Sequence, residues 1–234
     1  MSKFQVIVAD CPWELNDSLT MSTTPRGASS NYPLLDTTEL CKLRVKDLSD
    51  PSGCVLVLWS LGSMLEDAMK VMKSWGFTQK QIFVWVKTKK QPLQSLKKNL
   101  RKSKKLTGAE VISNVQKEID AFNVNDVLAF GMGRLFRQTH EICLIGINST
   151  MIYKSLKNKS QRSVAFHPST KHSKKPEDLQ DYLETMFPNT TKLEMFGRRL
   201  RPNWTVVGNE VCKGEDIRDS IERLIKSNVP GVTT

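Results

Sequence analysis

Long apolar runs, closely spaced cysteines and clustered histidines are all missing from this 234-residue sequence. Without a run of about 18 apolar residues, no segment is expected to span a membrane. The N-terminus has no basic stretch followed by an apolar one, so we expect no secretion signal. The five cysteines are never spaced C-x-x-C and there are only three histidines, so neither a disulfide framework nor a metal site is predicted. Reduced thiols fit a cytoplasmic protein of a microbial or phage-infected cell, or a nuclear one in a eukaryote.

Acidic residues are absent from residues 87–105, which hold nine lysines and arginines. The rest of the chain therefore carries only +2 of the net charge of +11. A concentrated block of positive charge is typical of proteins that bind a polyanion, and nucleic acid is the commonest one. The alternative is a solvated surface loop. Five members of the block are predicted to contact the substrate: Lys87, Lys97, Lys98, Arg101 and Lys102.

Apolar runs alternate with amphipathic segments, which predicts an α/β layered fold with a mostly parallel sheet. Six runs read as strands, at residues 4–9, 54–59, 81–86, 141–146, 192–196 and 204–207. The last two are a candidate hairpin. Capping pairs mark the starts of three helices, at Asp36 and Glu39, Ser63 and Glu66, and Thr107 and Glu110. Two further amphipathic helices are expected after Pro176 and around Ile217–Ile225.

Residues 88–130 interrupt the alternation of strands and helices. They contain most of the basic block and then a helical pattern of apolar residues that begins after Thr107. We therefore predict a single domain over residues 1–234 with a basic, partly helical insertion at 88–130.

The first strand ends in Asp10-Cys11-Pro12-Trp13. Pro12 stops the strand, so Asp10 and Trp13 should lie at its carboxyl end, where open α/β sheets bind their ligands. The alternative is an ordinary exit from a strand into a turn. The polar, turn-rich residues 16–33 follow as a long loop, and loops of this length at strand ends often carry function.

Several short motifs occur in the order found in a known family. They are Ala-Asp-x-Pro-Trp at 9–13, Asn31-Tyr32-Pro33, Leu56-Val57-Leu58-Trp59, Trp75-Gly76-Phe77, Val84-Trp85-Val86-Lys87-Thr88, His140-Glu141, His172-Ser173-Lys174-Lys175-Pro176-Glu177, Glu194-Met195-Phe196-Gly197-Arg198, Pro202-Asn203-Trp204 and Gly208-Asn209-Glu210. Together they resemble the N6-adenine methyltransferase family with the Asp-Pro-Pro-Trp motif, which includes the catalytic subunit that writes N6-methyladenosine on mRNA. The resemblance covers nearly the whole chain outside residues 88–130 and the C-terminal end.

The resemblance implies a Rossmann-like fold that uses S-adenosylmethionine, with the catalytic motif ahead of much of the cofactor site. It makes Asp10, Cys11, Pro12 and Trp13 the catalytic residues. Cys11 stands where the family has its first proline, and the family uses the backbone carbonyl of that residue, which cysteine also supplies. The cofactor-binding residues that the resemblance implies are Asp10, Lys175, Glu194, Phe196, Arg198, Asn209 and Glu210.

Trp13, Tyr32 and Trp85 are predicted on the substrate side, where an aromatic face can stack on a base. Most of these positions also have a plainer interpretation. Lys175 could be a solvated lysine at a helix start, with Lys174 in its predicted role. Glu194 could be a solvent-facing strand residue, Arg198 a surface arginine and Tyr32 a loop anchor. Core packing is the alternative for Trp59, Trp85, Phe196 and Trp204.

These features predict an S-adenosylmethionine-dependent enzyme that methylates the exocyclic amine of a flipped-out adenine in DNA. The sequence has no zinc knuckle and no RNA-binding module, which favours DNA over RNA. RNA N6-adenosine methylation is the first alternative. The second is a non-catalytic nucleic-acid-binding subunit, against which the intact Asp10, Pro12 and Trp13 argue. The expected partner is nucleic acid, and no contact with a membrane is expected. The chain could form a homodimer or heterodimer.

Overall fold

The computed structural model describes residues 3–14, 33–91, 94, 98, 107–131, 135–169, 175–211 and 214–227. Its strands are β1 (Val6–Ala9), β2 (Val55–Ser60), β3 (Thr78–Thr88), β4 (His140–Ile147), β5 (Val164–Pro168), β6 (Lys192–Met195) and β7 (Trp204–Val207). Its α-helices are α1 (Thr37–Lys42), α2 (Val45–Leu48), α3 (Leu65–Ser74), α5 (Gly108–Asp120), α6 (Asp178–Met186) and α7 (Ile217–Ser227). Short 3-10 helices cover η2 (Gly62–Met64), η4 (Val124–Val127) and η5 (Thr150–Lys154).

The chain divides into two compact units. The first comprises Met1–Val84, Glu141–Ser163 and Glu177–Thr234, and the second comprises Trp85–His140 and Val164–Pro176. The N-terminal part of β3 belongs to the first unit and its end to the second. No helix among the described residues is long and apolar enough to cross a membrane.

The strands form one seven-stranded sheet in the order β5-β3-β4-β2-β1-β6-β7. β1 lies in the middle of a parallel group, paired with β2 on one side and β6 on the other, and β7 is parallel to β6. β4 runs antiparallel to β2. The predicted Rossmann-like α/β fold with a mostly parallel sheet is therefore confirmed.

The expectation of a hairpin between β6 and β7 was wrong. The two strands are parallel, with Lys192 opposite Trp204 and Met195 opposite Val207. Parallel neighbours need a connection that returns the chain to the starting edge before the next strand begins. Residues 196–203 make this return, and Arg201 in it bonds to α6. A short spacing between two apolar runs does not distinguish the two arrangements.

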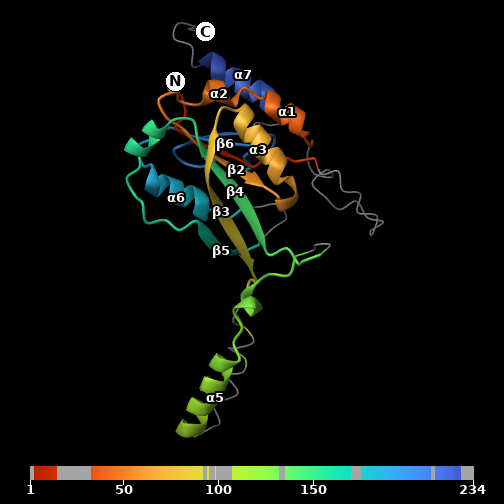
Figure 1. Cartoon of the computed structure of the whole chain (residues 1–234), viewed down its shortest axis with the longest axis vertical. Helices are drawn as coiled ribbons and strands as arrows, with labels where there is room; N and C mark the ends of the chain where they lie inside the picture. The colour runs from red at the N-terminus through yellow and green to blue at the C-terminus, as the bar shows by residue number, and fades with distance from the viewer. Residues whose placement is uncertain are drawn as a thin grey trace, which may run out of the picture. The chain divides into compact units, whose positions relative to one another are not determined.

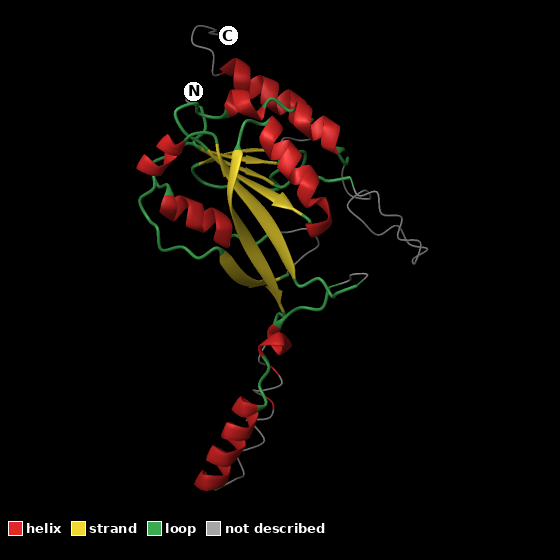
Figure 2. Ribbon diagram, in the orientation of Figure 1, coloured by secondary structure: helices red, strands yellow, loops and turns green. Residues whose placement is uncertain are grey.

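The two faces of the sheet in the first unit are both covered. Figure 1 shows α6 on one side of the strands and α1, α3 and α7 on the other, and Figure 2 shows the same layers by element type. Because side chains alternate along a strand, Ile7, Leu56 and Leu193 share one face, where they pack in a core cluster with residues of α1, α3 and α7. Glu194 points to the opposite face and meets α6 through Gln180.

Two of the three predicted capping pairs are present. Asp36 and Glu39 form a reciprocal capping box at α1, and Thr107 and Glu110 form one at α5. The prediction for Ser63 and Glu66 was wrong, because the chain first makes the 3-10 turn η2 and α3 then begins after Met64 without a side-chain cap.

The second unit is built around the end of β3. Thr88 pairs with Leu128 in an antiparallel bridge, and the backbone N–H of Lys89 donates to Val127 O (2.9 Å). The residues on the two sides of segment 90–126 are therefore bonded to each other at the end of β3. The helix predicted inside this insertion is present as α5, but none of its side chains is buried. The prediction of one domain with this insertion remains a prediction.

Candidate active site

The Asp10–Trp13 turn directly follows β1 and is fixed by backbone hydrogen bonds on both sides. The Asp10 N–H donates to Met195 O (3.4 Å), which ties the turn to the end of β6. The Trp13 N–H donates to Cys11 O (3.0 Å) across Pro12, and the Leu35 N–H donates to Pro12 O (2.9 Å). Since the proline ring also restricts the backbone, the Asp10 and Cys11 groups are held in place before any ligand arrives.

Trp13 packs into the core beneath this turn. Its side chain is only 6% exposed, and its Nε1–H donates to the backbone oxygen of Trp59 in β2 (3.0 Å). The indole therefore links the exits of two neighbouring strands. Its predicted stacking on a base remains a prediction, while its observed contacts are those of a residue that positions the turn.

Cys11 offers its carbonyl rather than its sulfur. Burial of the thiol raises its pKa well above the usual value, and the nearby charge of Asp10 raises it further. The sulfur thus stays protonated and is a poor nucleophile. The carbonyl oxygen accepts one hydrogen bond from Trp13, which leaves it a second lone pair.

Three parallel strands end level with one another and gather the residues that follow them. Ala9 of β1 pairs with Met195 of β6, which pairs with Val207 of β7. Asp10, Arg198 and Glu210 therefore come to the same edge, and Arg198 Nε lies 3.4 Å from Glu210 Oε1 in an ion pair. The carboxyl edge of parallel strands is where open α/β sheets bind ligands.

Two glycines let the backbones behind β6 and β7 approach each other at this edge. The Gly197 N–H donates to Val207 O (3.0 Å). A Cβ placed on Gly208 would overlap the carbonyl oxygen of Gly197 and lie 2.8 Å from its amide nitrogen. Phe196, just before, has a left-handed backbone (φ 61°), which is uncommon for a bulky residue and places strain at the site. Both glycines lie within the motifs described above, but no local sequence pattern predicted that their backbones approach each other.

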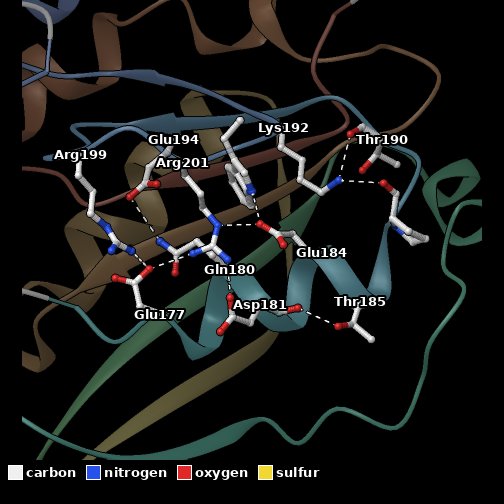
Figure 3. Close-up of polar contacts among 12 residues, drawn as sticks. Glu177, Gln180, Asp181, Glu184, Thr185, Thr190, Lys192, Glu194, Arg199 and Arg201 are labelled. Atoms are coloured by element: carbon white, nitrogen blue, oxygen red, sulfur yellow. Dashed lines mark hydrogen bonds and ion pairs between the residues drawn. The ribbon is translucent and has the colours of Figure 1, made fainter.

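Glu194 lies half-buried on the α6 face, one strand away from Asp10. Burial raises the pKa of its carboxyl group, and the charge of Asp10 adds to this, against the opposing effects of Arg201 and Gln180. Gln180 Nε2 donates to Glu194 Oε1 at 3.4 Å, while the buried Gln180 Oε1 has no partner among the described residues. Figure 3 shows this pair above α6. The solvent-facing alternative for Glu194 does not describe this structure.

Sequence reasoning missed Arg201, which is the centre of the charge network in Figure 3. Its side chain is 13% exposed and pairs with Glu184 (2.7 Å), Glu177 (2.9 Å) and Asp181. Trp204 Nε1–H also donates to Glu184 Oε1 (2.8 Å). Burial alone would raise the pKa of Glu184, but hydrogen bonds from Arg201 and Trp204 outweigh it and hold that pKa below its usual value. The partners lie 17 to 24 residues from Arg201 in sequence, too far apart for a local pattern to reveal them.

Four of the predicted site residues that the structure describes belong to the second unit: Lys175, Trp85, Lys87 and Lys98. Trp85 is buried, its Nε1–H donates to His167 O (2.9 Å), and Lys87 Nζ lies 5.1 Å from its ring centroid. The core interpretation therefore describes Trp85, and its substrate contact remains a prediction. Lys175 is half-buried and Lys98 is exposed.

Asn209 is exposed, next to Glu210. The other predicted site residues lie outside the described residues: Tyr32, Lys97, Arg101 and Lys102. Within the described residues, no group of three or more histidine, cysteine or acidic side chains could hold a metal ion.

Comparison with known proteins gives a family match over most of the chain. The family model described as MT-A70 matches residues 4–132 and 123–210. The two matched ranges contain the turn after β1, the ends of β6 and β7, and the insertion.

Relatives are similar over nearly the whole chain at modest identity. The N(6)-adenosine-methyltransferase subunit METTL3 of Danio rerio is 26% identical over 213 residues, which is 90% of this chain and 28% of the relative. The N(6)-adenosine-methyltransferase MT-A70-like protein of Drosophila melanogaster is 27% identical over 90% of this chain and 27% of its own length. The type II methyltransferase M.MunI of a Mycoplasma species is 26% identical over 89% of this chain and 78% of its own length. The chain thus spans less than a third of the first two relatives.

Proposed function

This chain belongs to the MT-A70 family, and from that premise we propose that it is an N6-adenine methyltransferase acting on DNA. The N6-adenine methyltransferases of this family use S-adenosylmethionine. The observation that carries the proposal is the level ending of β1, β6 and β7, which gathers the Asp10 carboxylate, the Cys11 carbonyl and the Arg198–Glu210 pair at one edge.

The chemistry requires hydrogen-bond acceptors for a weak nucleophile. The exocyclic amine of adenine shares its lone pair with the ring, so methylation is favoured by groups that hold both N–H hydrogens and make the nitrogen pyramidal. Asp10 supplies a carboxylate, and Cys11 supplies the second lone pair of its carbonyl oxygen. A preorganised carboxylate facing the positive charge that develops on nitrogen lowers the barrier by about 3 kcal/mol.

The residues at the strand ends fit a cofactor that carries both charges and hydroxyl groups. Arg198 and Glu210 form a partly exposed ion pair, Asn209 adds an amide, and Gly197 and Gly208 leave the backbone there without side chains. These residues and Asp10 would hold S-adenosylmethionine. When bound, the cofactor supplies a methyl group on a sulfonium centre. The protonated Cys11 thiol is consistent with chemistry that needs no protein nucleophile.

We favour DNA over RNA because one match extends over most of a relative. The type II methyltransferase M.MunI is matched over 78% of its own length. The basic block at 87–105 suits either polymer. RNA is the second candidate, because the N(6)-adenosine-methyltransferase relatives match about 90% of this chain.

Methyl transfer from tritiated S-adenosylmethionine tests the proposal directly. The purified chain is given plasmid DNA, single-stranded DNA and RNA of matched sequence, and the label is located as N6-methyladenine by mass spectrometry. Label in DNA at a faster rate than in RNA is the expected result. Faster labelling of RNA would make RNA the substrate. Absence of methyl transfer together with absence of S-adenosylmethionine binding by calorimetry would support the non-catalytic alternative.

A further inference from the structure

The loop that joins the insertion to β4 exposes large apolar side chains. Phe130, Leu135 and Phe136 are 76%, 93% and 87% exposed, although they lie close together in sequence. Single exposed apolar residues are ordinary, but a group of them marks an interaction site. The guanidinium carbon of Arg137 lies 4.8 Å from the ring centroid of Phe130, so a planar cation already stacks on one of the rings.

This loop is held firmly at its base. The Ala129 N–H donates to Lys87 O (2.8 Å), and the Lys87 N–H donates to Thr139 O (2.7 Å). Both ends of the loop are therefore bonded to the backbone of one β3 residue. Anchoring of this kind reduces the ordering that a partner would have to impose on the aromatic side chains.

The charge around the loop suits a polyanion. No acidic residue occurs from 127 to 140, and Arg137 lies within this stretch. Lys87 and Lys89 bond through their backbones to residues at the base of the loop, and Lys89 and Lys90 are exposed. Exposed rings beside cations are the combination that binds unpaired nucleotides, with bases stacked on the rings and phosphates near the charges.

We propose that Phe130, Phe136 and Arg137 form a stacking surface for an unpaired base of the nucleic-acid substrate. The inference rests on the proposed function, since it assigns one contact of the same substrate. Stacking on an aromatic ring tolerates any base, so this surface contributes affinity for unpaired strands and little sequence preference. A fully paired duplex offers no free base face and should gain less from it.

Fluorescence anisotropy with a labelled single strand of about 15 nucleotides tests the surface. Phe136→Leu keeps an apolar side chain but removes the ring, and should raise Kd about tenfold. Arg137→Lys keeps the charge but removes the planar group, and should also weaken binding. Phe166→Leu is the matched control, because Phe166 is 61% exposed on β5 in the same unit but lies outside the loop. Phe136→Trp keeps an aromatic ring and should retain the wild-type affinity, with indole fluorescence quenched on binding.

Several results would overturn the inference while leaving the proposed function intact. One is an unchanged Kd in Phe136→Leu together with normal methyl transfer. Another is equal weakening by Phe166→Leu, which would reflect a general surface effect. A third is loss of a dimer in sedimentation when Phe136→Ala leaves the Kd unchanged, which would make the loop a contact between copies. If the unaltered chain binds no nucleic acid but binds S-adenosylmethionine, the proposed function itself fails.

Discussion

The turn after β1 and the loop at residues 129–139 both combine aromatic rings with charged groups, yet they use them in opposite ways. In the turn, Trp13 is buried and its N–H is bonded to a neighbouring strand. In the loop, Phe130 and Phe136 are exposed, and Arg137 stacks on a ring. The first region is preorganised for chemistry on one atom, whereas the second offers surface to a partner. Burial, rather than residue type, separates the two roles.

The same contrast holds for the positive charges. Arg201 in the first unit is 13% exposed and pairs with three carboxylates of α6 and its N-terminus. The basic block at 87–105 has no acid in its own sequence. A largely buried arginine that is paired with carboxylates stabilises the fold, while a block of basic residues with no acid in its own sequence attracts a polyanion. Five variants test this division, in order of expected effect.

Asp10→Asn should greatly slow methyl transfer and leave the fold unchanged. The amide keeps the shape of the side chain but loses the charge that stabilises the developing cation, so we expect a fall in kcat of about 100- to 1000-fold. Methyl transfer at saturating substrate measures it, and thermal unfolding should show an unchanged fold. Asp67→Asn on α3 is the matched control. Retention of most turnover would remove Asp10 from the catalytic assignment.

Replacing four basic residues of the block by glutamine should weaken binding without changing the fold. Each lost phosphate contact lowers the slope of log K against log salt by about 0.9, and together the four should cost about 100-fold in affinity at low salt. The substituted residues are Lys97, Lys98, Arg101 and Lys102. A control variant changes four exposed lysines of the first unit: Lys42, Lys46, Lys70 and Lys73. Equal loss in both variants would mean that only total charge matters.

Gly208→Ala should damage the strand ends through packing. The new methyl group would overlap the carbonyl of Gly197, and backbone cannot move aside as a flexible side chain can. We expect a loss of about 3 kcal/mol in the free energy of unfolding, at the upper end for overpacking. Urea denaturation measures the loss, and calorimetry should show weaker cofactor binding. Gly108→Ala at the start of α5 meets no atom within 4 Å and should be harmless. A neutral Gly208→Ala would show that the strand ends can separate.

Arg201→Met should destabilise the first unit by about 2 kcal/mol at neutral pH, since three carboxylates each lose one ion pair. The lowered pKa of Glu184 gives this effect a pH dependence. The stabilisation is complete above the usual carboxyl pKa of 4.5 and disappears as pH falls through the lower pKa of the folded state. Arg223→Met removes an exposed pair with Glu215 and should cost less. If the difference in the free energy of unfolding between the wild type and Arg201→Met stays constant with pH, the ion pair between Arg201 and Glu184 does not contribute to stability as described.

Glu194→Gln should produce the smallest change, and of the opposite sign. Because the folded-state pKa of Glu194 is raised, ionising it opposes folding. Below the usual glutamate pKa of 4.5, the variant and the wild type should have the same free energy of unfolding. The variant should become slightly more stable than the wild type as pH rises through the raised pKa of Glu194. Urea denaturation across that range measures the difference. Lower stability of the variant at neutral pH would show that the carboxylate has a stabilising partner there.

The sequence alone was sufficient for the fold class and for much of the element order, because apolar runs and capping pairs such as Asp36 and Glu39 act locally. The sequence also placed Asp10 correctly at the end of β1. The level ending of β1, β6 and β7 was not predicted, because the last two strands were expected to form a hairpin. The resemblance supplied the cofactor and the identity of these residues, which periodicity could not.

What escaped prediction depends on contacts between distant residues. The direction of β7, the pairing of Arg201 with α6 and the approach of Gly208 to Gly197 are set by long-range packing. The apolar pattern of α5 predicted a helix correctly but implied a buried face that the structure lacks. Periodicity reports that a helix is amphipathic, and it does not say whether the apolar face is covered.

The bonds from the backbone of β3 to residues 127–129 have an evolutionary consequence. The two ends of the insertion are joined at a single closed stem, so the entropy of loop closure is set there and changes only slowly with the length beyond it. Segments of other lengths can therefore replace residues 90–126 at little cost in free energy to the sheet. Under the proposed contact between the basic block and nucleic acid, an exchange of this one segment would alter the choice of substrate without rebuilding the fold.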